Sequence, residues 1–373
     1  MSKLKLLTIL GTRPEIIKLS QVIKLSDLCF EHTLVHTGQN WDYNLNEIFF
    51  SELGLRSPDY FLGCVGASLG ETVGNIIAKS YEIFTKVRPD AVLILGDTNS
   101  ALSAISAKRL KVPIFHMEAG NRCFDENLPE EINRKIVDHI SDINLPYTEH
   151  ARRNLLAEGI KSESVFVTGS PMPEVIKGAA AQIEESKILK ELKLKKGGYF
   201  IVSAHREENI DDPGTFCSLM DAINFIAEHY KMPVIYSMHP RSKKFIEERA
   251  VKFHKNIRAA KPFGFFDYNS LQKNAFCVLS DSGTLAEESN ILNFPAVSLR
   301  TSTERPEVLD KGSFIIGGVT RGEVLQAVEL AVGIKEIPFA CAQDYTDVNV
   351  SAKVVKIIQS YTGIVNRTVW RKF

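Results

Sequence analysis

The sequence predicts an α/β protein made of two doubly wound domains. Short β-branched, apolar runs alternate with longer amphipathic segments from one end of the chain to the other, which is the pattern of parallel strands joined by crossover helices. The chain has 373 residues, and at roughly one to two hundred residues per domain this length predicts two domains. Near the middle, a glycine pair at 197–198 is followed at once by a fresh apolar run, so the alternation starts again.

The first half of the chain predicts one sheet covered by helices on both faces. Its expected strands are short enough to be buried, and the segments between them are amphipathic. Thr148 precedes one such segment and suits an N-cap, because its hydroxyl can accept a hydrogen bond from a free backbone N–H. The expected strands are residues 4–10, 32–37, 91–95, 114–117, 142–145 and 165–168, and the expected helices include 15–28, 69–86, 99–110 and 148–158.

The second half repeats this alternation. A charged helical stretch over 173–196 separates the halves, so we expect domains 1–172 and 173–373, with the last helix packing back on the first domain. Two such domains facing one another make a cleft, and open parallel sheets bind ligands beyond the carboxyl ends of their strands. The expected strands are residues 199–204, 234–238, 257–260, 276–279, 296–299 and 313–316.

Composition and charge exclude several classes of protein. Hydrophobic residues make up 44% and charged residues 24%, which is typical of a globular chain and excludes disordered and fibrous proteins. Lys plus Arg and Asp plus Glu both number 45, so no net field attracts nucleic acid or an acidic membrane. No run approaches the roughly 18 to 20 apolar residues of a membrane span, and no cleavage site follows the first strand. We therefore expect a cytoplasmic protein.

The cysteines and histidines predict neither a metal site nor a disulfide framework. The six cysteines are scattered without a C-x-x-C pair, and no histidines have the spacing of H-E-x-x-H. A G-x-G-x-x-G fingerprint is absent as well, which makes a dinucleotide site of the usual type unexpected. We expect catalysis without a cofactor or a metal.

The first expected strand ends in a candidate anion site. The segment from Gly11 to Glu15 turns into a helix that also carries Lys18. Free N–H groups and the cations Arg13 and Lys18 then point the same way, which suits an anionic ligand. The alternative is that both are solvated cations at a helix start.

Three acids follow the next strands of the first half. Asp97 lies just beyond residues 91–95, Glu118 directly beyond 114–117, and Glu130 soon after in a Pro-Glu-Glu segment. Acids that meet at one edge of a sheet perturb one another's ionisation, and can then supply both a proton donor and a proton acceptor. The alternatives are an N-cap role for Asp97, and first-turn acids favoured by the helix dipole for Glu130 and Glu131.

Two histidines follow strands of the second half. His205 comes directly after residues 199–204, and His239 directly after 234–238. A histidine at such a strand end can move a proton near neutral pH or donate a hydrogen bond to phosphate. A structural histidine is the alternative.

A candidate nucleotide site follows in the same half. Ser282 and Gly283 come just after the strand at 276–279 and open a helix, which suits a diphosphate because the helix N–H groups are free. Glu288 lies farther along that helix, where a carboxylate can accept the two hydroxyls of a ribose. Arg305, after the strand at 296–299, is a further contact for phosphate or sugar.

These motifs and their order along the chain resemble those of the non-hydrolysing UDP-N-acetylglucosamine 2-epimerase family. The resemblance extends to about residue 310, and eight motifs in register leave little room for accident. The motifs are G-T-R-P-E-x-x-K at 11–18, G-D-T at 96–98, E-A-G-x-R at 118–122, P-E-E-x-N-R at 129–134, H-R at 205–206, D-S-G at 281–283, E-E at 287–288 and T-E-R-P-E at 303–307.

The resemblance implies two facing Rossmann-like domains of the glycosyltransferase-B type, usually in a homodimer. It implies inversion of carbon 2 of a UDP-amino sugar, by elimination of UDP to a glycal and re-addition of UDP. The carboxylates and the histidine of the expected active site are Asp97, Glu118, Glu130 and His205. The implied diphosphate contacts are Arg13, Ser282 and Gly283, the ribose ligand is Glu288, and Lys18 and Arg305 are further contacts.

The finer details resemble the capsule and O-antigen branch of the family. They are the segments 38–43, 118–124 and 168–172, and they imply conversion of UDP-2-acetamido-2,6-dideoxy-L-talose to UDP-N-acetyl-L-fucosamine. Two departures matter: Glu207 replaces the second arginine that usually follows H-R, and the loop from Cys123 to Leu128 is shorter. The alternatives are interconversion of UDP-N-acetylglucosamine and UDP-N-acetylmannosamine, a hydrolysing epimerase, a glycosyltransferase of the same fold, and a nucleotide-sugar sensor.

Overall fold

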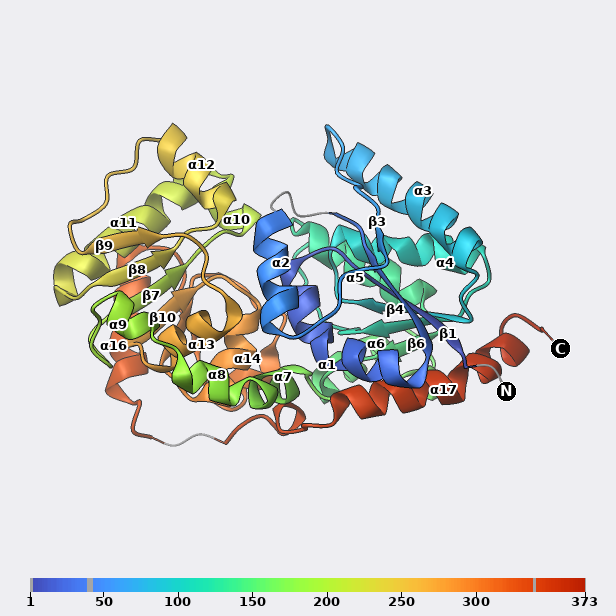
Figure 1. The fold of residues 1–373 in the computed structure, drawn as a ribbon. Helices are drawn as coiled ribbons and strands as arrows, with labels where there is room; N and C mark the ends of the chain where they lie inside the picture. The colour runs from blue at the N-terminus through green and yellow to red at the C-terminus, as the bar shows by residue number, and fades with distance from the viewer. Residues whose placement is uncertain (1–2, 39–42, 338–339, 373) are drawn as a thin grey trace. The chain divides into compact units, whose positions relative to one another are not determined.

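The computed structural model describes residues 3–38, 43–337 and 340–372, and the chain divides into two units. The first unit comprises Met1–Gly178 and Thr346–Phe373, and the second comprises Ala179–Tyr345. Helix α7 (Met172–Gly178) therefore belongs to the first unit, and the chain crosses slightly later than the sequence pattern suggests. The long C-terminal helix α17 (Val350–Thr368) also belongs to the first unit, where it packs on α1 (Arg13–Cys29) (Figure 1).

Each unit is built on a parallel sheet, with six strands in each sheet within the described ranges. The strand order is β3-β2-β1-β4-β5-β6 in the first unit and β12-β11-β10-β7-β8-β9 in the second. Numbered within its own unit, each sheet has the order 3-2-1-4-5-6. Helices flank both sheets (Figure 1), so the expected α/β class and the doubly wound architecture are confirmed.

The remaining elements of the first unit follow in chain order. They are β1 (Lys5–Leu10), β2 (Glu31–His36), α2 (Tyr43–Glu52), β3 (Tyr60–Phe61), α3 (Leu69–Val87), β4 (Ala91–Leu95), η1 (Asn99–Ser103), α4 (Ala104–Arg109), β5 (Ile114–Met117), α5 (Pro129–Ile140), β6 (Ile143–Leu145), α6 (Glu149–Ala157) and η2 (Ser162–Ser164). Thr148 caps α6 as expected, since its side chain accepts the backbone N–H of Ala151.

The second unit contains all six of its expected strands: β9 has the expected bounds, β10 is shifted by one residue, and the other four are shorter. Its elements are α8 (Ala180–Glu185), α9 (Ile188–Glu191), β7 (Phe200–Ser203), α10 (Glu207–Ile210), α11 (Pro213–Tyr230), β8 (Val234–Ser237), α12 (Pro240–Glu248), β9 (Ile257–Ala260), α13 (Phe265–Lys273), β10 (Cys277–Ser280), α14 (Thr284–Leu292), β11 (Ala296–Ser298), α15 (Pro306–Leu309), β12 (Ile315–Ile316), α16 (Arg321–Gly333) and η3 (Gln343–Tyr345).

One expected strand of the first unit is wrong. Residues 165–168 form only an isolated bridge, between Val165 and Asn144, and β3 takes the sixth place at the opposite edge. Strand β6 ends at Leu145, immediately before Pro146. Because proline has no N–H to donate, Pro146 cannot complete the ladder beside 165–168, although its carbonyl still accepts the Thr168 N–H at 3.0 Å.

The shared strand order fixes where chemistry can take place in each unit. The connections change direction between the first and fourth strands, which are β1 and β4 in the first unit and β7 and β10 in the second. Ligands of such sheets bind outside the carboxyl ends at this switch point. Strands β4 and β10 are buried at every position, so only the residues beyond their ends reach solvent.

Within the described residues, none of the helices combines the length and the apolar character that crossing a bilayer would require.

Gly120 occupies a backbone position that tolerates no side chain. Its φ is +82°, and a Cβ would lie 2.3 Å from the carbonyl oxygen of Ala151 in α6. Gly159 has a similar φ of +86°, but a Cβ added there would meet nothing within 4 Å. We expect Gly120→Ala to lower the free energy of unfolding by about 3 kcal/mol and Gly159→Ala by about 1 kcal/mol, because only the first adds a clash to the backbone strain. Urea denaturation of both variants measures this difference, and equal losses would contradict it.

Candidate active site

The turns that follow β4 and β5 hold the first two expected acids. The two strands are adjacent and parallel, and Leu95 is level with Met117. Asp97 and Glu118 therefore leave the sheet at the same edge. The Glu118 carboxylate lies close to the turn that carries Asp97, since a Cβ added to Gly96 would lie 3.9 Å from Glu118 Oε2.

Asp97 is bound by an arginine and not by the helix that follows it. Its Oδ2 accepts hydrogen bonds from Nε of Arg134 at 2.7 Å and lies 2.7 Å from Nη2 of the same side chain. The 3-10 turn η1 begins after Thr98 without a side-chain cap, so an N-cap role for Asp97 is wrong. Asn133 donates to the Asp97 carbonyl at 2.9 Å, and both partners belong to α5. The start of α5 thereby fixes the turn.

Glu118 has an unusual backbone conformation and a buried partner. Its φ is +63°, in the left-handed region that residues other than glycine seldom adopt. The Lys18 ammonium lies 2.6 Å from Glu118 Oε2, and the two side chains are 6% and 10% exposed. Lys18 is therefore not a solvated helix cation. Strained conformations of this kind cluster at functional sites.

The adjacent glutamates at the start of α5 differ in their surroundings. Glu131 is fully buried, accepts the backbone N–H groups of Cys123 and Phe124, and pairs with Arg134 at 2.8 Å. Glu130 is half-buried on the same first turn. Glu131 is thus occupied in holding the loop, and a proton-transfer role for Glu130 stays a prediction.

A buried histidine and aspartate connect the two acid-bearing turns. His116 Nε2 lies 2.8 Å from the Gly96 carbonyl, and Nδ1 lies 2.9 Å from Asp138 Oδ1. Both neighbours are acceptors, which favours hydrogen on both ring nitrogens and therefore the imidazolium form. Burial lowers the pKa of His116, but the hydrogen bond and charge of Asp138 outweigh it and raise the pKa above 6.5.

Asp138 completes this connection. Its Oδ2 accepts the Gly120 N–H at 3.0 Å and lies 2.8 Å from the Arg122 guanidinium. Burial raises the pKa of Asp138, but His116 and Arg122 lower it below its ordinary value overall. The turn that carries Glu118 is therefore fixed to the turn that carries Asp97.

Glu15 links the candidate anion turn to the Asp97 turn. Its buried carboxylate accepts from the Gly11 N–H at 3.0 Å, from the Thr12 hydroxyl at 2.7 Å and from the Thr98 hydroxyl at 3.3 Å. Burial raises its pKa to about 7, against the opposing effect of these hydrogen bonds. Arg13 comes directly after Thr12 in this turn, and its guanidinium carbon lies 5.6 Å from the centre of the Phe49 ring.

In the second unit, His205 and His239 follow β7 and β8, which are neighbouring strands. Their rings stack with centroids 5.2 Å apart and an angle of 26°. His239 Nδ1 accepts the Arg241 N–H at 3.2 Å and so caps α12. Glu207, at the position where the family usually has arginine, pairs with Arg241 at 2.6 Å.

The turn after β10 lies across the switch point from His205. Ser282 and Gly283 come directly before α14, and the Ser282 hydroxyl lies 3.0 Å from that of Thr284. A Cβ on Gly283 would lie 2.9 Å from Glu304 Oε1, so the backbone passes close to that acid. Within its unit, this turn has the position expected for a diphosphate site.

The two remaining expected contacts are buried. Glu288 accepts a hydrogen bond from Gln272 at 2.7 Å and is 6% exposed. Arg305 is 2% exposed and lies 3.2 Å from Glu287 and 4.0 Å from Glu307. A ligand role for these two residues stays a prediction.

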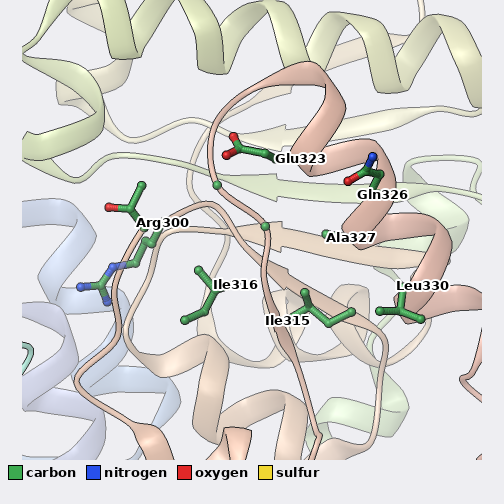
Figure 2. Close-up of a pocket in the computed structure, with 10 residues that line it drawn as sticks. Arg300, Ile315, Ile316, Glu323, Gln326, Ala327 and Leu330 are labelled. Atoms are coloured by element: carbon green, nitrogen blue, oxygen red, sulfur yellow. The ribbon is translucent and has the colours of Figure 1, made fainter.

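A separate cavity of about 470 Å³ opens beside the edge strand β12 (Figure 2). Its wall includes Ile315, Ile316, Ala327 and Leu330, and the Arg300 guanidinium is directed away from Ile316. The guanidinium instead pairs with Glu304 at 2.7 Å. None of the expected site residues lines this cavity. Across residues 3–38, 43–337 and 340–372, three or more potential metal ligands do not gather at any point.

Sequence reasoning missed the residues that hold the expected ones in place. Asp138 and Arg134 lie in α5, where the sequence predicts only an ordinary amphipathic helix, and at Asp281 it predicts only a turn. A signal was available for Asp138, which directly follows the apolar pair Ile136 and Val137, and for Asp281, which comes just after the apolar run of β10, but not for Arg134, which stands between Asn133 and Lys135. Part of the segment 38–43 lies outside the described residues.

Comparison with known proteins gives one consistent result. The family described as UDP-N-acetylglucosamine 2-epimerase matches residues 24–359. This chain belongs to that family. A structure of UDP-N-acetylglucosamine 2-epimerase from Rickettsia bellii is 47% identical, covers 99% of this chain and 100% of its own, and has a TM-score of 0.92.

Two further members of the epimerase family are similar over most of the chain. The UDP-GlcNAc 2-epimerase of Methanocaldococcus jannaschii, solved with UDP-GlcNAc and UDP, is 35% identical, covers 96% of this chain and 100% of its own, and has a TM-score of 0.90. The UDP-2,3-diacetamido-2,3-dideoxy-D-glucuronate 2-epimerase of Pseudomonas aeruginosa is 33% identical over 88% of this chain and 93% of its own. Membership in the epimerase family makes this chain an isomerase.

The charge on His116 predicts a pH dependence of stability. Its folded-state pKa is raised above 6.5, so its contribution to stability is complete below about pH 6.5 and is lost as the pH rises through the folded-state value. We expect the difference in unfolding free energy between the wild type and His116→Gln to shrink as the pH increases. Urea denaturation at a series of pH values measures the difference. A constant difference would mean that His116 is neutral in the folded protein.

Proposed function

We propose that this epimerase inverts carbon 2 of a UDP-amino sugar by eliminating UDP and adding it back. The observation that carries the proposal is the edge formed by Asp97 and Glu118, with Asn133 and Arg134 of α5 bound to the Asp97 turn. Carbon 2 has no adjacent carbonyl, so its proton is too weakly acidic for direct exchange. A reaction through a glycal avoids this difficulty.

The elimination step needs one base and one leaving group. A carboxylate removes the hydrogen of carbon 2 as a proton while the bond between carbon 1 and the diphosphate oxygen breaks. UDP leaves with the electron pair as an anion, and a double bond forms between carbons 1 and 2. In the reverse step, a proton is delivered to the opposite face of carbon 2 and the UDP oxygen attacks carbon 1.

The proton transfers are assigned to Asp97, Glu118, Glu130 and His205. Each such transfer is typically worth a factor of about 10² to 10⁴ in rate. Lys18 keeps the Glu118 side chain in one position, and Arg134 does the same for Asp97. Two acids held by different cations, from α1 and from α5, suit approach to two faces of one sugar.

The departing UDP is assigned to cations and to free N–H groups. Arg13 and the α14 start at Ser282 and Gly283 stabilise the developing negative charge of the diphosphate. Glu288 accepts the ribose hydroxyls, with Gln272 orienting its carboxylate. Lys18, His239 and Arg305 are the further substrate contacts of this proposal. No cofactor takes part in it.

The proposed sugar is UDP-2-acetamido-2,6-dideoxy-L-talose, which becomes UDP-N-acetyl-L-fucosamine for surface polysaccharide synthesis. Phe124 supports this choice, because it lies in the loop between Glu118 and Glu130 with its side chain 75% exposed. Glu131 fixes the Phe124 N–H, and φ at Phe124 is +59°. An exposed apolar side chain on a backbone held in this way suits the methyl group of a 6-deoxy sugar. The family resemblance implies a homodimer, and the cytoplasmic location expected from the sequence stays a prediction.

The second candidate is the interconversion of UDP-N-acetylglucosamine and UDP-N-acetylmannosamine. The names of the relatives from Rickettsia bellii and Methanocaldococcus jannaschii favour it. Both candidates use the same acids and the same nucleotide contacts. They differ only at carbon 6 and in the configuration of the ring.

If these four residues transfer protons, replacing them should lower kcat without changing the affinity for UDP. We expect Asp97→Asn, Glu118→Gln, Glu130→Gln and His205→Ala each to lower kcat by roughly 10² or more, while UDP binds with nearly unchanged affinity by calorimetry. Glu126→Gln is the matched control, since Glu126 is an exposed acid of the same loop that pairs with Lys135. Full activity in one of the four variants removes that residue from the proposal.

The elimination route predicts exchange with solvent at carbon 2. The proton removed from one face is not the one returned to the other, and at least one of the carboxylates exchanges with water. Product formed in heavy water should therefore carry deuterium at carbon 2, as measured by mass spectrometry and NMR. Epimerised product without deuterium would exclude the two-base route.

The choice of sugar is tested with a panel of UDP-amino sugars supplied without an acceptor. We expect the 6-deoxy-L-talose substrate to give the highest kcat/KM, and Phe124→Ser to lower its preference over UDP-N-acetylglucosamine by roughly tenfold, the cost of a lost apolar contact. Ile136→Ser, on an exposed position of α5, is the control. A preference for UDP-N-acetylglucosamine in the wild type selects the second candidate. Accumulation of free UDP would indicate a hydrolysing enzyme.

A further inference from the structure

Asp281 holds the turn that carries His205. It follows β10 directly, and its fully buried Oδ2 accepts the backbone N–H groups of His205 at 2.8 Å and Arg206 at 2.9 Å. Asn209 donates to the same oxygen at 3.1 Å. The Asp281 N–H in turn donates to the Ser203 carbonyl at 3.1 Å. The ends of β7 and β10 are therefore joined through one side chain.

The second oxygen of this carboxylate faces the imidazole. Asp281 Oδ1 accepts no hydrogen bond from the described part of the chain, and it lies 3.5 Å from His205 Nδ1. That distance is longer than an ordinary hydrogen bond. Such contacts at active sites often shorten only when substrate is bound. His239 covers the ring by stacking, which limits its rotation.

We propose that Asp281 is the positioning residue of His205, which keeps the imidazole proton on Nδ1 and leaves Nε2 as the acceptor. The inference rests on the proposed role of His205 as a proton-transfer residue. A carboxylate beside Nδ1 can only accept, so it stabilises the tautomer with hydrogen on that nitrogen. Burial raises the pKa of Asp281 above its ordinary value, and the Arg206 N–H and guanidinium, together with the bonds from Asn209 and His205, oppose that rise. The three N–H groups that donate to Oδ2 favour the carboxylate at this position.

The variant Asp281→Asn separates orientation from folding. Its amide oxygen can still accept the N–H groups of residues 205 and 206, while its NH₂ group replaces Oδ1. That group donates to Nδ1, and the imidazole proton then moves to Nε2. We expect kcat to fall by about 10², within the usual range for a misdirected acid or base, and UDP affinity to change by less than about twofold.

The decisive measurement is the tautomer of His205 by NMR of protein labelled with ¹⁵N-histidine, with His205→Gln identifying the signals. The wild type should show hydrogen on Nδ1 and Asp281→Asn should show it on Nε2. Asn209→Ala is the matched control. It removes donors to Asp281 Oδ2 and to the Leu299 carbonyl, so it should lower the midpoint of urea unfolding without changing the tautomer.

The outcomes distinguish failure of the role of Asp281 from failure of the proposed function. Hydrogen on Nε2 in the wild type overturns the role of Asp281, even if Asp281→Asn does not fold. The same tautomer in the wild type and in a folded Asp281→Asn also overturns it. A wild type that epimerises none of the UDP-sugars refutes the proposed function instead, because the tautomer is measured without turnover.

Discussion

The architecture of both units depends on buried carboxylates that accept backbone N–H groups beyond the ends of the strands. Within the described part of the chain, the acids that do this include Glu15, Glu131, Asp138 and Asp281. Their partners are the N–H groups of Gly11, of Cys123 and Phe124, of Gly120, and of His205 and Arg206. A turn that leaves a sheet has lost its ladder partners, so its N–H groups need acceptors. A carboxylate supplies several at once, and its charge strengthens each bond.

The same arrangement explains why the buried charges come in opposite pairs. A buried carboxylate without a partner is costly, and removing one partner of a buried pair typically costs about 3 to 5 kcal/mol. Arg134 faces Glu131 as well as Asp97, and Arg122 and His116 face Asp138. Arg134, which satisfies the supporting acid Glu131, thus also positions Asp97, which can take part in the reaction. The same network of ion pairs therefore holds the turns in place and orients a candidate catalytic acid.

Sequence patterns predicted the sheets well, because parallel strands buried on both faces leave continuous apolar runs. They failed at residues 165–168, where the apolar run is real but Pro146 removes the pairing donor. The positions of Asp97, Glu118 and His205 followed from the rule that strand ends carry function. Their supports did not, since Asp138 lies 20 positions after Glu118 along the chain. Only the register of β4 with β5 and the placement of α5 bring such residues together.

Glu15 shows what such support costs. Its pKa is raised from 4.5 to about 7, so the folded state binds a proton that the unfolded chain releases near pH 4.5. The folded protein therefore loses stability from this group as the pH rises from 4.5 towards 7. The raised pKa of His116 lowers stability in the same direction, as the pH rises above 6.5. An apolar residue would avoid that loss. It would also release the Gly11 N–H and the Thr98 hydroxyl, and with them the link between the Arg13 turn and the Asp97 turn. Retaining a destabilising acid at this point is understandable only if the relative position of those two turns matters more than the stability of the fold.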